Sequence, residues 1–304
     1  MAKKSKTSNS EIKKNTVLFL VEGDSDQHAL EYSIQELFDV VDSRYRIVFA
    51  KQKQPVEVVD DEDDESIVLN EDDENSEDEY DDDELDDDEK EKFGGDVTTA
   101  YGVWPKNIEY IINNRFFVPV IHKENLYAKR LLKVIQIVDL DGAYIPDESL
   151  VPYEEERYDF DKFFYNTERQ VIEGDPIKAA KRNYHKRKNI DALVSKNVIH
   201  IQGREVPYSI YYFSSNLDHV INQDANLNGG KVNAADRFAE KYYDDLEGFL
   251  TFFDEYNSGE FRGLDYEESW NLVRDRTKTY SIQPGTNLHL LLREILEKRF
   301  SLPK

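Results

Sequence analysis

The stretch that decides the fold is VLFLVEGDSD, which runs from Val17 to Asp26. Its first five residues are apolar and rich in β-branched and aromatic types, which predicts a short buried strand. Gly23 then allows a sharp turn, and the polar residues that follow it can cap a helix. A strand that turns into a helix at this point delivers Glu22 to the edge of a sheet, with Asp26 one helical turn further on.

A second stretch repeats this pattern, LLKVIQIVDLDG from Leu131 to Gly142. It is an apolar strand that ends in acids, and in an extended chain Asp139 and Asp141 project to the same side because side chains alternate. Two neighbouring carboxylates repel each other unless a cation lies between them. Hard divalent ions such as Mg²⁺ prefer oxygen ligands of this kind. The sequence therefore predicts two strand ends that could contribute to one magnesium site.

Together the two motifs resemble the TOPRIM domain of topoisomerases, primases and several nucleases. The form Glu22-Gly23-x-x-Asp26 is most similar to the TOPRIM of the overcoming-lysogenization-defect nucleases and related anti-phage effectors. The resemblance implies that Glu22, Asp139 and Asp141 hold Mg²⁺, for which Mn²⁺ can substitute, and that Asp26 helps to bind a second metal.

Further expectations follow from the same resemblance. It implies a metal-dependent nuclease that hydrolyses phosphodiester bonds in DNA or RNA, acting in antiviral defence or abortive infection. Family members carry a lysine, for which Lys231 is the candidate here. The chain has no phosphate-binding loop of the Gly-x-x-x-x-Gly-Lys type, so any nucleotide hydrolysis would come from an ATPase partner, as is frequent among such effectors.

Charge is distributed very unevenly along the chain. The net charge is −25, and the segment from Glu57 to Glu91 has 23 acids and one lysine, so it alone accounts for −22. Self-repulsion and scarce apolar residues predict a disordered insertion over residues 55–95, either a solubilising linker or a mimic of nucleic acid. The rest is nearly neutral. The absence of cysteine and of long apolar runs favours a cytoplasmic protein with no membrane partner.

The remaining pattern is that of an α/β protein. A helix over Ser25–Val41 and a strand over Tyr45–Ala50 begin a mostly parallel, TOPRIM-like sheet flanked by helices. Further expected elements are a helix over 106–117, a helix over Phe160–Glu173 and strands over Asn197–Ile201 and Tyr208–Phe213. Helical patterns follow over Val232–Tyr256, Tyr266–Arg274 and Asn287–Phe300. The expected organisation is a disordered tail (1–15), an α/β domain (16–230) interrupted by the insert, and a helical part (231–304) packed on the sheet.

A basic stretch supplies the expected contact with nucleic acid. Six cationic residues lie within eleven positions with no acid among them, and at helical spacing they predict a basic face that tracks a phosphate backbone. These residues are Lys178, Lys181, Arg182, Lys186, Arg187 and Lys188. Asp218 lies just after a predicted strand and is a further candidate, because open α/β sheets gather their ligands at the carboxyl ends of strands. A homo-oligomer is compatible with this organisation.

Two alternatives compete with the nuclease interpretation. Asp139-x-Asp141 after an apolar strand is also similar to the first motif of haloacid-dehalogenase-type phosphatases, in which Ser214 and Lys231 would supply two later motifs. That family also needs an acidic pair after another strand, and it gives Glu22 no role. The second alternative is a non-enzymatic acidic regulator whose insert mimics nucleic acid. It explains the charged run but not the two acidic strand ends.

Overall fold

The computed structural model describes residues 15–51, 96–153 except 101, 125 and 127, 163–227, and 229–297. The acidic insert and all of the expected tail except Asn15 lie outside the described residues. Asn15 itself begins the first strand.

The described helices and strands alternate at first and become helical towards the C-terminus. In chain order they are β1 (Asn15–Val21), α1 (Asp24–Asp42), β2 (Tyr45–Lys51), α3 (Ile108–Ile112), the π-helical turn η2 (Asn113–Phe117), α4 (Val118–Lys123), η3 (Ala128–Arg130), β3 (Leu131–Asp139), η4 (Asp147–Ser149), β4 (Leu150–Val151), β5 (Phe164–Asn166), β6 (Val171–Glu173), α5 (Pro176–Val194), β7 (Val198–Ile201), β8 (Arg204–Phe213), α6 (Leu217–Asn222), α7 (Lys231–Lys241), α8 (Leu246–Asp254), η5 (Gly259–Phe261), α9 (Tyr266–Val273), η6 (Tyr280–Ile282) and α10 (Leu288–Leu296).

The main sheet has the strand order β2-β1-β3-β8-β7. The first four strands run parallel to one another, and β7 forms an antiparallel hairpin with β8. Strand β1 lies near the middle, and residues 17–21 are fully buried because both sides of the strand are apolar. The expected α/β class is therefore confirmed, with a sheet that is mixed rather than wholly parallel.

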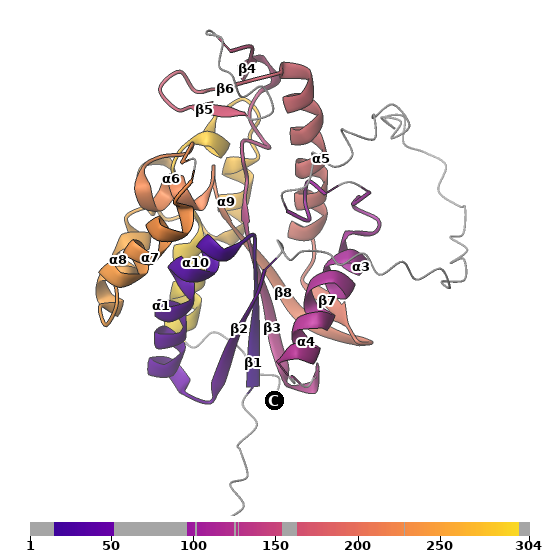
Figure 1. Cartoon of the computed structure of the whole chain (residues 1–304), viewed down its shortest axis with the longest axis vertical. Helices are drawn as coiled ribbons and strands as arrows, with labels where there is room; N and C mark the ends of the chain where they lie inside the picture. The colour runs from indigo at the N-terminus through magenta and orange to yellow at the C-terminus, as the bar shows by residue number, and fades with distance from the viewer. Residues whose placement is uncertain are drawn as a thin grey trace, which may run out of the picture.

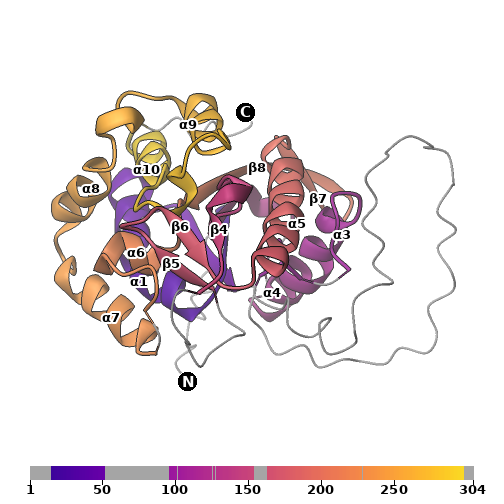
Figure 2. The same ribbon diagram turned by 90° about the horizontal axis from the view of Figure 1, so that it is seen from above.

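Helices cover both faces of this sheet (Figure 1). Helices α1, α7, α8 and α10 pack on one face around a core that includes Phe19, Leu30 and Leu291. Helices α3, α4, α5 and α9 pack around a second core on the other face, with Leu18 and Trp270 among its members. The view from above shows α1, α7, α8 and α10 on one side of the main sheet and α3, α4 and α5 on the other (Figure 2). The C-terminal helices α7, α8 and α10 contribute to the first of these cores and α9 to the second.

Three predicted helices differ from the observed structure. The helix expected over Phe160–Glu173 is wrong for the described part, because β5 and β6 form a hairpin there and Gln170 at its turn has a positive φ; Phe160 lies outside the described residues. The helix expected over 106–117 continues to Lys123 as α4. The two parts are joined by η2, a wider helical turn just before Pro119, and Pro119 has no N–H to donate to a regular helix. The long helix from Val232 is interrupted before α8.

The hairpin β5–β6 and strand β4 form a small second sheet of order β4-β6-β5. It lies beyond the carboxyl end of β3 and beside the start of α5 (Figure 1). Within the described ranges, no helix has both the length and the apolar character needed to cross a membrane.

Candidate functional site

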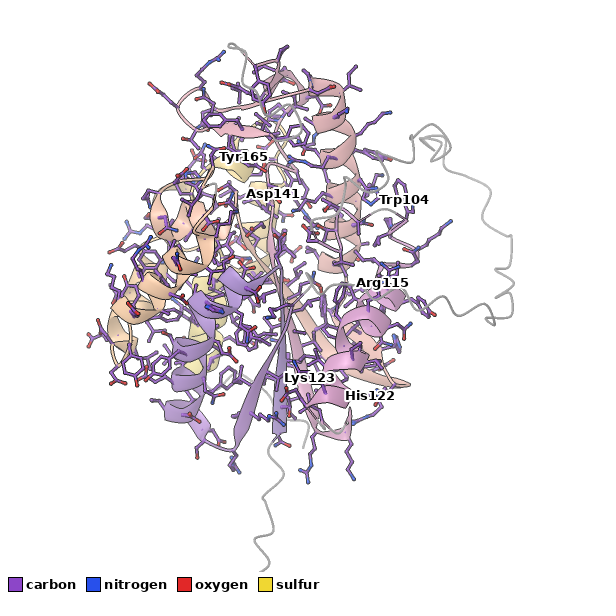
Figure 3. The ribbon with its side chains drawn as sticks, viewed as in Figure 1. Trp104, Arg115, His122, Lys123, Asp141 and Tyr165 are labelled. Atoms are coloured by element: carbon purple, nitrogen blue, oxygen red, sulfur yellow. The ribbon has the colours of Figure 1, made fainter. Side chains whose placement is uncertain are left out.

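The carboxyl ends of the parallel strands meet at one edge of the main sheet. Glu22 follows β1 directly, Asp139 is the last residue of β3, and Asp218 lies in α6, which follows β8. Asp141 lies at this edge close to Tyr165 of the small sheet, whereas Arg115, His122 and Lys123 lie on the helices alongside the sheet (Figure 3). The edge predicted from the two acidic motifs therefore exists and gathers their side chains.

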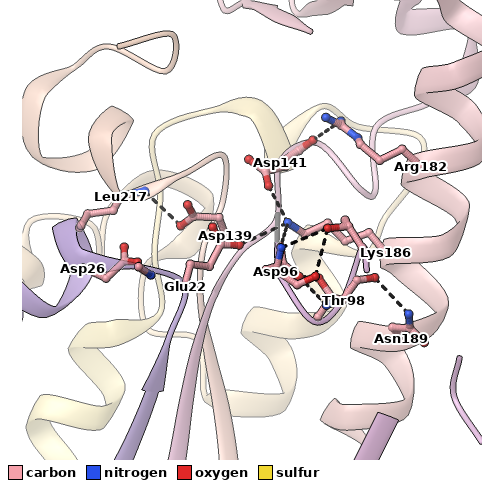
Figure 4. Close-up of polar contacts among 12 residues, drawn as sticks. Glu22, Asp26, Asp96, Thr98, Asp139, Asp141, Arg182, Lys186, Asn189 and Leu217 are labelled. Atoms are coloured by element: carbon pink, nitrogen blue, oxygen red, sulfur yellow. Dashed lines mark hydrogen bonds and ion pairs between the residues drawn. The ribbon is translucent and has the colours of Figure 1, made fainter. Parts of the chain in front are cut away.

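Four side chains form the centre of the site (Figure 4). Carboxylate oxygens of Glu22, Asp96 and Asp141 lie within 4.8 Å of one another, which is close enough to hold a metal ion. The ammonium group of Lys186, from α5, lies among them. Its Nζ is 2.5 Å from Oδ2 of Asp141, 2.9 Å from Oδ2 of Asp96 and 3.6 Å from Oε1 of Glu22. Lys186 is fully buried, so water does not screen these contacts.

Asp96 is held in place by its own turn and by α5. The backbone N–H of Thr98 donates to Oδ1 of Asp96 at 2.5 Å, and the Thr98 hydroxyl donates to the same oxygen. The Asn189 amide, one turn beyond Lys186 on α5, donates to the carbonyls of Thr98 and Val103. The helix that supplies the buried ammonium thus also positions the segment that carries its partner.

Asp141 is presented by a turn rather than by a strand. Strand β3 ends at Asp139, and Asp141 has φ of 49°, in the left-handed region. The expectation that Asp139 and Asp141 project from one extended strand is therefore wrong. The backbone N–H of Asp141 donates to the Ser215 carbonyl at 2.8 Å, and its carboxylate accepts from the Tyr165 hydroxyl at 3.2 Å. These contacts turn the Asp141 carboxylate towards Lys186.

A second group of carboxylates adjoins the first (Figure 4). Oδ1 of Asp139 accepts from the backbone N–H of Leu217 at 3.1 Å, and Oδ2 of Asp26 accepts from the N–H of Gly23 at 2.8 Å. Glu22 lies between the two groups. We call Glu22, Asp96, Asp141 and Lys186 the paired half of the cluster. We call the side on which Glu22 and Asp139 face each other, with Asp26 nearby, the unpaired half, because no ion pair joins Asp139 to a cation among the described residues.

The two halves differ in their electrostatics. In the unpaired half, burial raises the pKa of Asp139 well above its usual value, and the charges of Asp26 and Asp141 raise it further. Burial and the charge of Asp139 likewise raise the pKa of Glu22. In the paired half, burial alone would raise the pKa of Asp96, but the Lys186 ammonium holds it well below its usual value. An excess of negative charge therefore remains around Asp139.

The donor set fits a divalent cation. Every candidate ligand is a carboxylate, the type that Mg²⁺ and Mn²⁺ prefer. Oε1 of Glu22 is buried and accepts no hydrogen bond, which is costly for an isolated protein group. A cation bound between Glu22 and Asp139 would supply the partner that this oxygen lacks.

The basic stretch does not form one exposed face. It forms α5 as predicted, but Lys186 points into the cluster, so its expected contact with a phosphate backbone is wrong. Arg182 donates to the Asp141 carbonyl at 2.7 Å, and Arg187 donates to the Ala143 carbonyl at 2.8 Å. These two guanidinium groups support the turn that carries Asp141. The exposed cations of the stretch are Lys178, Lys181 and Lys188.

The two further candidates form an ion pair beside the cluster. Nζ of Lys231, the first residue of α7, is 2.9 Å from Oδ2 of Asp218, which is buried. Burial lowers the pKa of Lys231, but Asp218 and the more distant charges of Asp139 and Asp141 outweigh it and raise the pKa. Lys231 is therefore a cation near the unpaired half, and half of its side chain is exposed.

The roles of Asp96 and Lys186 are not evident from the sequence pattern alone. Asp96 follows the acidic run, so its charge was not distinguishable from the 23 acids before it. A signal for Lys186 was present, because the buried positions of α5 include Ala179, Asn183, Lys186 and Ile190, at spacings of four, three and four. A lysine on the buried face of a helix needs a buried partner.

Comparison of the chain with protein-family models, with curated proteins and with solved structures gives no match.

Proposed function

We propose that this protein is a metal-dependent nuclease of the TOPRIM type that hydrolyses phosphodiester bonds. The observation that carries the proposal is the convergence of Glu22, Asp26 and Asp139 beside a buried carboxylate–ammonium group, at the carboxyl edge of a parallel sheet. Phosphoryl chemistry needs positive charge next to the phosphate oxygens, and a carboxylate cluster with excess negative charge recruits that charge as a divalent ion.

Each acid has a distinct part in this proposal. Glu22 and Asp139 would hold Mg²⁺, or Mn²⁺ in its place, and Asp26 would contribute from the first turn of α1. When bound, the ion would neutralise phosphate charge and lower the pKa of a bound water. The Leu217 N–H fixes one oxygen of Asp139, which leaves the other oxygen of that carboxylate to face the ion.

A nucleic acid is the proposed substrate, and the exposed lysines of α5 are the proposed contact with its backbone. Lys178, Lys181 and Lys188 are exposed on the helix whose buried face carries Lys186, so a strand bound by them would lie along the helix that borders the cluster. Such contacts give sequence-independent affinity. An ATPase partner remains a proposal that rests on the resemblance alone.

The phosphatase alternative has less support. Its proposed hydroxyl, Ser214, is fully buried and faces Gly285, because a Cβ added at Gly285 would lie 2.8 Å from the Ser214 oxygen. The proposed acid, Asp141, is engaged by Lys186 and Tyr165. Neither group is arranged to meet a phosphate at Asp139.

The test is a cleavage assay on plasmid, linear duplex DNA, single-stranded DNA and RNA with Mg²⁺ or Mn²⁺. We expect Glu22→Gln and Asp139→Asn each to reduce cleavage at least about 10- to 100-fold, because loss of even a partner that supports a metal ligand costs that much. The matched control is Glu205→Gln, an exposed acid in β8. Full activity in both site variants would exclude the proposal, and hydrolysis of phosphomonoesters alone would favour the phosphatase.

A further inference from the structure

Carboxylates surround the ammonium group of Lys186: two accept hydrogen bonds from it, and a third lies just beyond hydrogen-bond distance. An ammonium group has three N–H donors and no acceptor. Lys186 Nζ forms hydrogen bonds of 2.5 Å with Asp141 and 2.9 Å with Asp96, and Oε1 of Glu22 lies 3.6 Å away in the third contact. The side chain has no exposed surface. Lys186 therefore has no open side with which to hold a substrate.

The position of this ammonium coincides with a site that a metal ion would otherwise use. The three carboxylate oxygens around it are the group that lies within 4.8 Å, the spacing of ligands about one ion. The side chain comes from the middle of α5, and Asn189 on the same helix fixes the segment that carries Asp96. Moving the ammonium away would leave a buried charge with no partner, which is strongly unfavourable.

We propose that Lys186 is a built-in cation that permanently fills one of two cation positions in the cluster, so that the site binds a single divalent ion. That ion lies in the unpaired half, between Glu22 and Asp139, and Glu22 is shared by the ion and the ammonium. The inference rests on the proposed metal-dependent function and specifies its metal stoichiometry. The chain thus supplies with a lysine the charge that a second metal would supply.

The charges of the described side chains agree with this arrangement. Five acids contribute to the cluster, and Lys186 is the cation buried among them. One divalent ion and one ammonium carry three positive charges, and Lys231 adds a fourth at the rim. A second divalent ion would have to enter the same three oxygens that already contact Nζ.

The experiment counts bound Mn²⁺ by electron paramagnetic resonance on the full chain. Wild type, Lys186→Met and Lys186→Arg are compared, with Lys181→Met as the control for loss of an exposed lysine from the same helix. The double variant Glu22→Gln/Asp139→Asn carries the same acidic run and gives the background to subtract. We expect one Mn²⁺ above background in wild type, Lys186→Arg and Lys181→Met, and two in Lys186→Met, with the spectrum of a coupled pair.

Each outcome decides the question. Two ions in wild type would overturn the role of Lys186 but leave the metal-dependent function intact. No ion above background in wild type would overturn both. The wild-type count tests the inference even if Lys186→Met fails to fold, because the inference predicts one bound ion, not two, in the wild-type protein. An unchanged count of one in folded Lys186→Met would also overturn the inference.

Discussion

The two halves of the carboxylate cluster differ in charge balance, because only one of them contains an ammonium group. In the paired half, Asp96 accepts from Lys186 and its pKa is lowered. In the unpaired half, Asp139 has acids as neighbours and its pKa is raised. Burial by itself would raise the pKa of both Asp96 and Asp139, so it does not explain the difference. The comparison shows that one buried lysine sets the charge balance of the carboxylates around it.

The largest expected effect on stability is that of removing the Lys186 ammonium group. Lys186→Met leaves three carboxylates with no internal cation, and we expect the free energy of unfolding to fall by about 3–5 kcal/mol, as when one partner of a buried ion pair is removed. Urea unfolding at neutral pH with a chelator measures the change. Lys181→Met is the control and should change stability by less than about 0.5 kcal/mol. Equal effects of the two variants would contradict a buried ion pair.

A buried histidine outside the cluster also contributes to the pH dependence of stability, and its contribution must be measured separately from that of the cluster. Burial lowers the pKa of His289, in α10, to about 4 from its usual 6.5. The folded state therefore binds fewer protons than the unfolded state, and stability that is present above pH 6.5 is lost as the pH falls towards 4.

We expect His289 to reduce the free energy of unfolding by about 2 kcal/mol between pH 7 and pH 5. His289→Leu, which places an apolar side chain without a titratable group in the core, should remove that part of the acid sensitivity. Urea unfolding at the two pH values measures it. The same slope in the variant as in wild type would show that His289 does not titrate in this range.

Removing the negative charge of Asp139 should have a smaller effect on the free energy of unfolding, and in the opposite direction. The folded-state pKa of Asp139 is raised, so its favourable contribution is present below the unfolded pKa and is lost as the pH rises. At pH 8 with a chelator, Asp139→Asn should therefore raise the free energy of unfolding, by about 1 kcal/mol, as replacement of functional residues often does. An Asn oxygen can still accept from Leu217. Destabilisation at pH 8 would contradict the charge imbalance.

The exposed lysines of α5 are expected to affect nucleic-acid binding, whereas the buried Lys186 affects stability. Changing Lys178, Lys181 and Lys188 together to Gln should leave stability within about 0.5 kcal/mol of wild type. Binding to a DNA duplex should weaken, and the slope of log affinity against log salt concentration should decrease by up to about 3, about one for each lost phosphate contact. Fluorescence anisotropy over a salt series measures it. An unchanged slope would place the nucleic acid elsewhere.

The sequence predicts one part of this site well and another part poorly, for physical reasons. Glu22 and Asp139 follow apolar strands, and parallel strands bring their carboxyl ends to one edge, so local pattern was enough. Asp141 needed the left-handed turn that follows β3, which alternation along a strand does not predict. The pairing of Asp96 with Lys186 joins residues 90 positions apart, and only the packing of α5 on the sheet brings them together.

The elements show the same distinction. Helix α1 and strands β1 and β3 were predicted because their apolar periodicity is strong. The stretch before Glu173 has aromatic residues at spacings that fit a helix, but β5 and β6 pair as a hairpin. Tertiary pairing overrides local spacing in such short segments.

The most direct test of the account is the Mn²⁺ affinity of two matched variants, Asp139→Asn and Asp96→Asn, measured by titration against wild type. Each variant removes one acid from one half of the cluster and keeps the shape of the side chain. The account predicts that Asp139→Asn weakens Mn²⁺ binding at least about tenfold, as loss of a ligand does, while Asp96→Asn changes it much less. The reverse result would contradict the account, because it would place the metal among Glu22, Asp96 and Asp141 and displace Lys186.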